Sequence, residues 1–401
     1  MPADPATINR ANTIMSTGNY AAKLALLREL PVCPPSNYQH GGAHAFAPTL
    51  KSPLGVLDNR ATKYLTKKKL TTVSDRVAFI KFKARADASG EPGSIEFELK
   101  YAEDLPSDAS RVGYIPIWFL PWESGFMWKL KIESSVASPT LNIGAGTTAI
   151  ANPDVFFTAA INGCSVFARG AAADPSLYHG GAEQNEIATI RNQVGNAFWQ
   201  QIGGNAEGLW LNLFHGFDMA AGPLPPGGDP MTLMGQKHNP AKAADNSVGE
   251  VNKNDYVKQS VHGADILSPL SMGKANPADR DKPSTIQAVQ LENYLTSRPD
   301  FSHLRVEEVS PWGCVFGLRN GNNWEFYLQT NATVRYYTIH RKKRFARSTK
   351  TSYKGFGDQE YATLGQPMQW PKGQSVNMGT KQFFPGGHGH VAVDPRTFRF
   401  F

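Results

Sequence analysis

The feature that most constrains the fold is a series of short segments in which apolar and polar residues alternate. RVAFIKFKA (76–84) and SIEFELKYA (94–102) have the two-residue period of a half-buried strand. They flank DASGEPG (87–93), which has the composition of a hairpin turn. VGYIPIWFL (112–120) and GFMWKLKIE (125–133) follow closely. We expect the four segments to form one antiparallel sheet with one solvated face.

Further strand segments occur later in the chain. DVFFTAAINGCSVFARG (154–170) predicts either a strand pair or a strand, a turn and a strand, with the turn at Asn162-Gly163. Four short strand segments lie within 303–340, and RNGNNW (319–324) between them places Gly and Asn where a tight turn needs positive φ. We expect all of these segments to share one twisted β-core.

Two segments have helical spacing. Residues 8–30 predict one helix that ends at Pro31. Residues 186–202 predict a second helix packed on the β-core, with apolar side chains along one face: Ile187, Ile190, Val194 and Phe198. Residues 217–285 are rich in Gly, Pro, Asn, Asp and Lys, and we expect them to form long loops outside the core.

Composition supports a loop-rich globular protein. The 401 residues are 41% hydrophobic and include 37 Gly and 28 Pro, which suits many short strands better than a helical bundle. The predicted fold class is α+β, with a mainly antiparallel β-sandwich core, flanking helices and long loops. We divide the chain into an N-terminal helix and arm (1–60), the core with its loop insertion (61–345), and a loop-rich C-terminal extension (346–401).

The net charge of +7 is modest for this length, and much of it is local. RKKRFAR (341–347) has five cations in seven residues. It is either a solvated loop or a docking patch, formed by Arg341, Lys342, Lys343 and Arg344, for an acidic protein, a membrane or a nucleic acid. No basic stripe is interleaved with aromatic residues, so nucleic acid is not an expected partner.

The sequence contains few features that would indicate a membrane span, a secretory signal or disulfide bonds. VGYIPIWFLPW (112–122) is too short and too interrupted by proline to span a bilayer. The N-terminal residues lack the pattern of a cleaved secretory signal, so we expect a soluble protein that, if exported, uses a route without one. Cys33, Cys164 and Cys314 are far apart and form no C-x-x-C pair, which argues against a disulfide framework and a zinc ribbon.

The segment around Cys164 contains the parts of a cysteine nucleophile. A thiol nucleophile needs a base, donors for an oxyanion, and access for the substrate. Asn162-Gly163 permits a tight turn that frees backbone N–H groups near Cys164, and the next strand can bring His179 back beside the sulfur. Thr158, six residues before Cys164 on the same face of an extended strand, can bond the ring or a substrate. The alternative is that Cys164 packs in the core and His179 is a satisfied polar residue.

The arrangement T-x-x-x-[small polar]-G-C followed by a histidine resembles the Cys–His glutamine deamidase toxins, which include the cytotoxic necrotizing factor catalytic domain and the Burkholderia lethal factor. In this resemblance Thr158 matches the family threonine, Gly163 the motif glycine, Cys164 the nucleophile and His179 the base. The chain has Ile161-Asn162 where the family has Leu-Ser.

The resemblance implies hydrolysis of a protein glutamine to glutamate through a thioester, without a metal or an organic cofactor. It also implies a secreted effector that acts in a host cytosol on a host protein, since the named toxins modify Rho-type GTPases or a translation initiation helicase. A protease or a transglutaminase using the same dyad remains an alternative. So does a non-catalytic β-sandwich module that binds a protein or a glycan.

Other polar residues suggest competing sites. His388 and His390 in HGH, with Asp394, have the spacing of metal ligands on one strand face, but glycine neighbours favour a loop equally. His40 and His44 form a weaker version of the same pattern. Cys314 lies on an apolar strand without a nearby base, and we expect it to pack in the core.

Overall fold

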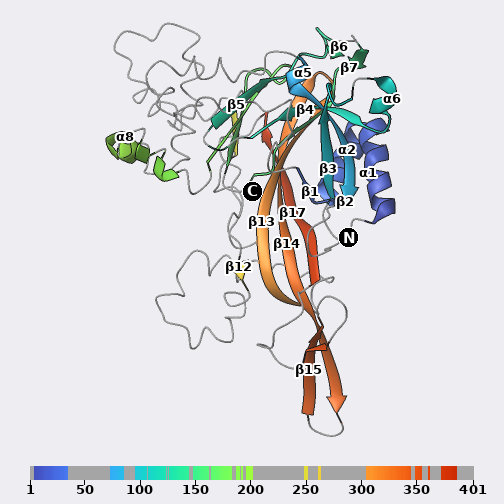
Figure 1. Ribbon diagram of the computed structural model, residues 1–401, viewed down its shortest axis with the longest axis vertical. Helices are drawn as coiled ribbons and strands as arrows, with labels where there is room; N and C mark the ends of the chain where they lie inside the picture. The colour runs from blue at the N-terminus through green and yellow to red at the C-terminus, as the bar shows by residue number, and fades with distance from the viewer. Residues whose placement is uncertain are drawn as a thin grey trace.

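The computed structural model describes residues 4–34, 73–84, 95–105, 107–122, 124, 126–143, 148–161, 164–182, 187–189, 191–192, 196–201, 248–251, 261–262, 304–344, 348–354, 360–361 and 372–385. The fold is α+β, as predicted, with a β-rich core and helices packed against it (Figure 1).

The larger sheet contains eleven strands, nine of which follow one path. Along that path the order is β1 (Val32–Cys33), β3 (Ile95–Tyr101), β2 (Val77–Ala84), β4 (Ile115–Leu120), β8 (Val155–Thr158), β13 (Leu304–Asn320), β14 (Asn323–Arg344), β15 (Ser348–Lys354) and β16 (Glu360–Tyr361). Two more strands join it, β12 (Val261–His262) beside β13 and β17 (Lys372–Phe384) beside β14. Its pairs are antiparallel except β1–β3 and β4–β8.

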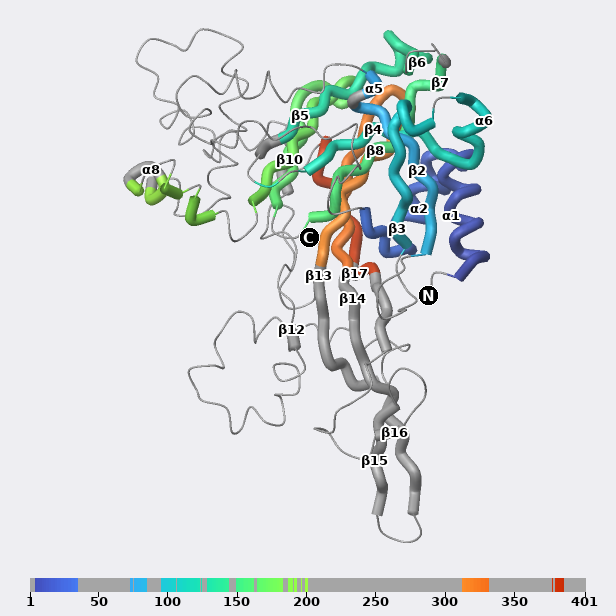
Figure 2. Tube along the Cα trace, in the orientation of Figure 1, coloured from blue at the N-terminus to red at the C-terminus, as the bar shows by residue number. Residues whose placement is uncertain are grey.

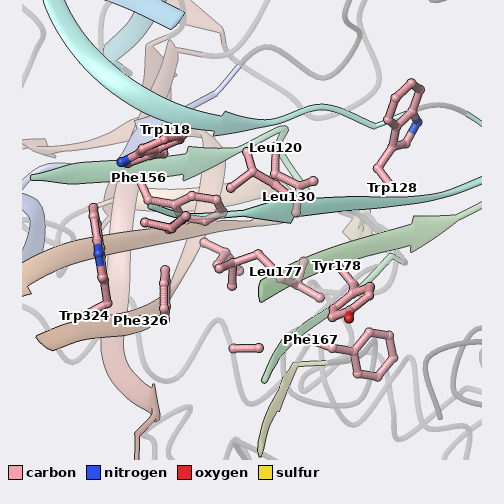
Figure 3. Packing of buried hydrophobic residues seen from close by; sticks show 14 of the residues in the cluster. Trp118, Leu120, Trp128, Leu130, Phe156, Phe167, Leu177, Tyr178, Trp324 and Phe326 are labelled. Carbon is pink, nitrogen blue, oxygen red and sulfur yellow. The ribbon is translucent and has the colours of Figure 1, made fainter. Parts of the chain in front are cut away.

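A smaller sheet packs on the larger one. Its order is β11 (Val248–Val251), β9 (Ser165–Arg169), β10 (Ser176–Gly181) and β5 (Phe126–Lys131), all antiparallel. Residues of both sheets form one buried apolar cluster, in which Leu120, Phe156, Leu130 and Leu177 meet between the layers (Figure 3). A separate hairpin joins β6 (Thr140–Ile143) and β7 (Thr148–Ala151).

Where its side chains are described, the larger sheet is buried on both faces. Strand alternation directs Phe156 toward the smaller sheet and Phe157 toward the opposite side, where the N-terminal helices pack. The expectation of one four-stranded sheet with a solvated face is therefore wrong in two respects. β2, β3 and β4 share a sheet, but β5 belongs to the other one. The continuous apolar run in β4 reflects burial on two sides rather than one.

The N-terminal segment forms two helices, α1 (Pro5–Thr17) and α2 (Tyr20–Glu29), instead of the single predicted helix. Gly18 ends α1 with its N–H on the Ile14 carbonyl, and the Asn19 side chain caps α2 by accepting from the Ala22 N–H. The predicted end before Pro31 is correct. Figure 2 shows α1 and α2 against the part of the sheet that contains β2 and β3, so the N-terminal helices cover the core. The arm expected after them, up to residue 60, lies mostly outside the described residues.

β13 and β14 form one long hairpin where four short strands were expected. Its turn contains Gly321 with φ of 61°, which matches the expected tight turn. The predicted boundary at 345 does not follow the sheet, because β17 pairs with β14 and brings Phe383 and Phe384 into the core. These distant pairings arise from tertiary packing and leave no local pattern.

Other short elements complete the described residues: α5 (Val73–Arg76), α6 (Asp108–Arg111) and α8 (Asn196–Gln201). The predicted helix over 186–202 is described only in part, and Trp199 of α8 is buried with the core. The predicted loops of 217–285 lie mostly outside the described residues. Within that range β11 and β12 are exceptions, because each pairs with a core strand.

Candidate active site

The candidate site lies between the two sheets, where β8, β9 and β10 come together. β8 of the larger sheet ends at Thr158, and Cys164 immediately precedes β9 of the smaller sheet. β10 runs antiparallel to β9 with His179 opposite Val166. In this register Cys164 and His179 occupy diagonal positions on one face of the smaller sheet, a spacing that long and aromatic side chains can bridge.

The segment that joins β8 to Cys164 is anchored on the larger sheet. Ile161 and Gly313 of β13 exchange two backbone hydrogen bonds, of 3.0 and 2.8 Å. A Cβ at Gly313 would lie 2.6 Å from the Ile161 side chain, so glycine permits this close approach. The bridge fixes the chain three residues before Cys164.

Thr158 determines which ring nitrogen of His179 has the proton. Its Oγ1 donates to the Leu120 carbonyl at 2.7 Å and lies 2.6 Å from His179 Nδ1. A hydroxyl has one proton, and a carbonyl oxygen only accepts. With that proton directed at Leu120, Oγ1 accepts from Nδ1–H. His179 is then the Nδ1–H tautomer, and Nε2 has the lone pair.

His179 is neutral in the folded protein. Its side chain is 0% exposed, and burial lowers its pKa to about 3 because a charged imidazolium would lose its hydration. Nε2 has no hydrogen-bond partner among the described residues. A buried, unbonded ring nitrogen with a lone pair is positioned to accept a proton from a neighbouring group.

Two residues that the sequence pattern did not single out, Gly181 and Trp122, lie close to Cys164. The thiol is buried, with 7% of the residue exposed. A Cβ at Gly181 would lie 2.6 Å from Cys164 Sγ and 2.5 Å from Trp122 Nε1. The sulfur and the indole edge therefore both rest on the bare backbone of Gly181. Two features of the sequence could have indicated this arrangement. They are the second glycine of HGG (179–181) and the tryptophan that ends the apolar run 112–122.

The structure brings Thr158, His179 and Cys164 to one interface, although not as expected for Thr158. Thr158 and Cys164 do not share a strand face, because the chain passes from the larger to the smaller sheet between them. Thr158 instead approaches the ring from the opposite layer. Asn162 and Gly163, the expected turn and source of oxyanion donors, lie outside the described residues.

The remaining predicted residues lie away from this interface or outside the described residues. Arg341, Lys342, Lys343 and Arg344 are not in a loop after a strand. They are part of β14, paired with Thr351, Lys350, Thr349 and Ser348 of β15. Cys314 is fully buried on the other face of the larger sheet, as expected for packing. The possible metal ligands His40, His44, His388, His390 and Asp394 lie outside the described residues.

The described residues contain no group of three or more His, Cys, Asp or Glu side chains arranged to hold a metal ion. Among the same residues, no helix is both long and apolar enough to cross a bilayer.

Comparison with known proteins does not assign the chain to a family. No protein-family model matches the chain, and no curated protein matches it either.

Proposed function

We propose that this protein is a cysteine-dependent deamidase that converts a glutamine of a partner protein to glutamate. The observation that carries the proposal is the state of His179. One ring nitrogen is held by Thr158, while the other has a lone pair, no partner among the described residues, and a place on the sheet face of Cys164. This is the order of orienting group, base and nucleophile that thiol acyl transfer requires.

The first half-reaction forms a thioester. His179 Nε2 takes the Cys164 proton as Sγ bonds to the carboxamide carbon, which becomes tetrahedral with a negatively charged oxygen. When the carbonyl re-forms, the C–N bond breaks, and the proton on Nε2 passes to the leaving nitrogen. Ammonia departs, and the acyl group remains on sulfur.

The second half-reaction restores the enzyme. Nε2 takes a proton from water as the water oxygen bonds to the thioester carbon. The C–S bond then breaks, the sulfur takes the proton from Nε2, and the product is the glutamate side chain. Thr158 contacts neither substrate nor sulfur in this scheme. It is a positioning residue that keeps the proton on Nδ1 and the lone pair on Nε2.

The pKa of His179 decides how the thiol is activated. A ring with a pKa of about 3 does not hold a preformed thiolate–imidazolium pair at neutral pH. Proton transfer therefore accompanies attack, and the charges form only when a substrate carboxamide is present to accept the electron pair. We expect the resting thiol to show little of the acid-shifted alkylation that is typical of ion-paired cysteines.

The substrate class follows from the resemblance of the T-x-x-x-N-G-C segment to the deamidase toxins. We propose that the chain acts on a host regulatory protein after secretion without a classical signal peptide. Arg341, Lys342, Lys343 and Arg344 are proposed to contact an acidic surface of that protein, since opposite charge accelerates association.

The test uses the two buried cysteines as a matched pair. Purified wild type, Cys164→Ser and Cys314→Ser are incubated with host-cell extract, and glutamine-to-glutamate conversion is mapped by mass spectrometry. Cys164→Ser should lower conversion by a factor on the order of 10⁴ or more, because serine is a far poorer nucleophile beside a weak base. Cys314→Ser should retain wild-type conversion.

Other outcomes would replace the proposal. Cleaved peptides or glutamine–lysine cross-links that depend on Cys164 would identify a protease or a transglutaminase with the same dyad. Full biological effect from Cys164→Ser would eliminate thiol chemistry and favour the binding module.

A further inference from the structure

We infer that Trp122 is a catalytic residue of the same site, whose indole N–H binds the carbonyl oxygen of the scissile carboxamide as negative charge forms on it. The inference rests on the proposed function and assigns a donor that the sequence pattern does not suggest. Trp122 follows β4 of the larger sheet, whereas Cys164 and His179 belong to the smaller one.

The first supporting observation is the hydrogen-bonding state of the indole. Trp122 Nε1 is shielded from solvent and has no acceptor among the described residues. An unpaired buried N–H is destabilising, so its presence in a native structure calls for an explanation. By contrast, the N–H of Trp118, four residues earlier on β4, donates to Asn152 Oδ1 at 3.2 Å.

The second observation is the position of that N–H. Trp122 Nε1 and Cys164 Sγ lie 2.5 and 2.6 Å from the point where a Gly181 Cβ would be. The two atoms are therefore no farther apart than the sum of these distances. An S–C bond, a C–O bond and a hydrogen bond of about 2.9 Å can bridge such a gap, as oxyanion stabilisation requires.

Gly181 maintains this geometry. It is the β10 position opposite Cys164 in the strand register, and any side chain there would collide with both the sulfur and the indole. The nucleophile and the donor can approach each other over β10 because this position has no Cβ.

The test compares two reactions of Cys164, of which one forms an oxyanion and the other does not. Hydrolysis of p-nitrophenyl acetate passes through a tetrahedral oxyanion, while alkylation by iodoacetamide displaces iodide and forms none. Trp122→Phe should lower the Cys164-dependent release of p-nitrophenolate by about 10²–10³-fold, the usual effect of removing one oxyanion donor. Alkylation of Cys164 should stay within about twofold of wild type. Trp324→Phe replaces another buried indole with a phenyl ring and should leave both rates unchanged.

The outcomes separate this inference from the proposed function. If the wild type shows no Cys164-dependent ester hydrolysis, the proposed function fails and Trp122 loses its role with it. If wild type hydrolyses the ester and Trp122→Phe does so equally well, only the role of Trp122 is wrong. An equal loss in both reactions would indicate a packing role. Should Trp122→Phe not fold, benzothienylalanine at 122 keeps the bicyclic shape without the N–H and is expected to give the same selective loss.

Discussion

The two faces of the larger sheet differ in how their buried polar groups are used. One face packs on α1 and α2, and the other packs on the smaller sheet. Each interface is apolar and holds one buried cysteine, Cys314 on the helix side and Cys164 on the sheet side. The polar residues beside these cysteines distinguish a structural interface from a candidate reactive one.

On the helix side, a buried glutamine connects α2 to the sheet. Gln329 Nε2 donates to the Leu30 carbonyl at 2.8 Å and also to the Leu27 carbonyl, and its Oε1 accepts from the Val32 N–H at 3.0 Å. These bonds satisfy carbonyls at the C-terminal end of a helix, which otherwise lack partners. Gln329 therefore uses its donors and its acceptor to hold the fold together.

The second polar link on the helix side is an ion pair. Lys23 of α2 bonds both carboxylate oxygens of Asp154, at 2.8 and 2.6 Å. On the same side of the sheet, burial raises the pKa of the Cys314 thiol well above its usual value, and the neighbouring Cys33 adds to the shift. A thiol that stays protonated is a poor nucleophile, so we expect Cys314 to be unreactive. The helix side is not free of unpaired atoms, because Trp312 Nε1 has no hydrogen-bond partner among the described residues.

On the sheet side, hydrogen-bonding capacity is left open near the cysteine. His179 Nε2 and Trp122 Nε1 have no partners among the described residues, and both belong to residues near Cys164. Open polar atoms in a native interior require an explanation, and substrate binding is the one proposed above. The contrast between the two sides is the unpaired base, because His179 Nε2 can accept a proton whereas an indole N–H such as that of Trp312 can only donate.

The largest expected effect that tests this contrast is that of His179→Gln. Loss of the base should lower glutamine conversion by about 10²–10⁴-fold.

The His179→Gln substitution should also change how the free energy of unfolding depends on pH. The pKa of His179 is about 3 in the folded protein, against an ordinary value of 6.5 for an exposed histidine. The unfolded chain therefore binds one more proton than the folded protein between these two pH values. Wild type should lose stability, on the order of a few kcal/mol, as pH falls from 6.5 toward 3.

Denaturant midpoints at pH 8, 6, 5 and 4 measure that difference. His179→Gln should show a shallower decline than wild type below pH 6.5, because glutamine does not titrate. At pH 8 the histidine is neutral in both states, so that value is the reference for each protein. Parallel declines in the two proteins would mean that His179 is not held neutral by burial.

A smaller effect is expected for Thr158→Val, which is nearly isosteric but removes both hydrogen bonds of the hydroxyl. The Leu120 carbonyl and Nδ1–H lose their partner, at a cost of about 1–3 kcal/mol in stability. Without the acceptor, the ring can place its proton on Nε2. We expect conversion to fall roughly 10- to 100-fold, less than the ~10⁴ that follows loss of a charged orienting group.

Two further variants identify the cause of this effect. Thr158→Ser keeps the hydroxyl and should recover most of the activity. Gln329→Met removes an equally buried hydrogen-bonding group on the helix side, and should lower stability while leaving conversion per folded molecule unchanged. Equal activity losses in Thr158→Val and Gln329→Met, at matched folded fraction, would show that the two interfaces do not differ in function.

The sequence predicted the parts of the fold that depend on local pattern. Alternation located β2 and β3, a short apolar segment located β4, and the Asn- and Gly-rich turn located the end of β13, because these features depend on neighbouring residues. Sheet membership was not predictable in the same way. Nothing within β5 indicates that it leaves its neighbours for the smaller sheet, since a strand's partner is decided by packing between distant segments.

The candidate site shows the same limit. The motif named Thr158, Cys164 and His179, but the spacing suggested that Thr158 and Cys164 share a strand face. The crossing between layers, which allows Thr158 to face His179, is a property of the assembled sandwich. Trp122 and Gly181 were missed because their relation to Cys164 exists only across strands.

The smallest expected effect concerns charge, and it compares the β14–β15 hairpin with the rest of the chain. Residues 335–354 contain eight Lys and Arg and no Asp or Glu. They therefore account for the whole net charge of +7, since the remaining residues are close to neutral. Replacing Arg341, Lys342, Lys343 and Arg344 with Gln should slow conversion of the host protein several-fold at low salt, because steering of an acidic partner is lost. The difference should vanish as salt screens both proteins.

Two measurements distinguish loss of a docking surface from loss of the active site or of the fold. Hydrolysis of p-nitrophenyl acetate needs no docking surface, so it should match wild type in the Gln variant, as should the melting temperature. Neutralising Lys67, Lys68 and Lys69, another run of consecutive cations, removes comparable charge away from β14 in the sequence and should have a weaker effect on conversion. If both sets of substitutions slow conversion equally, net charge alone attracts the partner. If neither does at any salt concentration, the cations of β14 are a solvated surface.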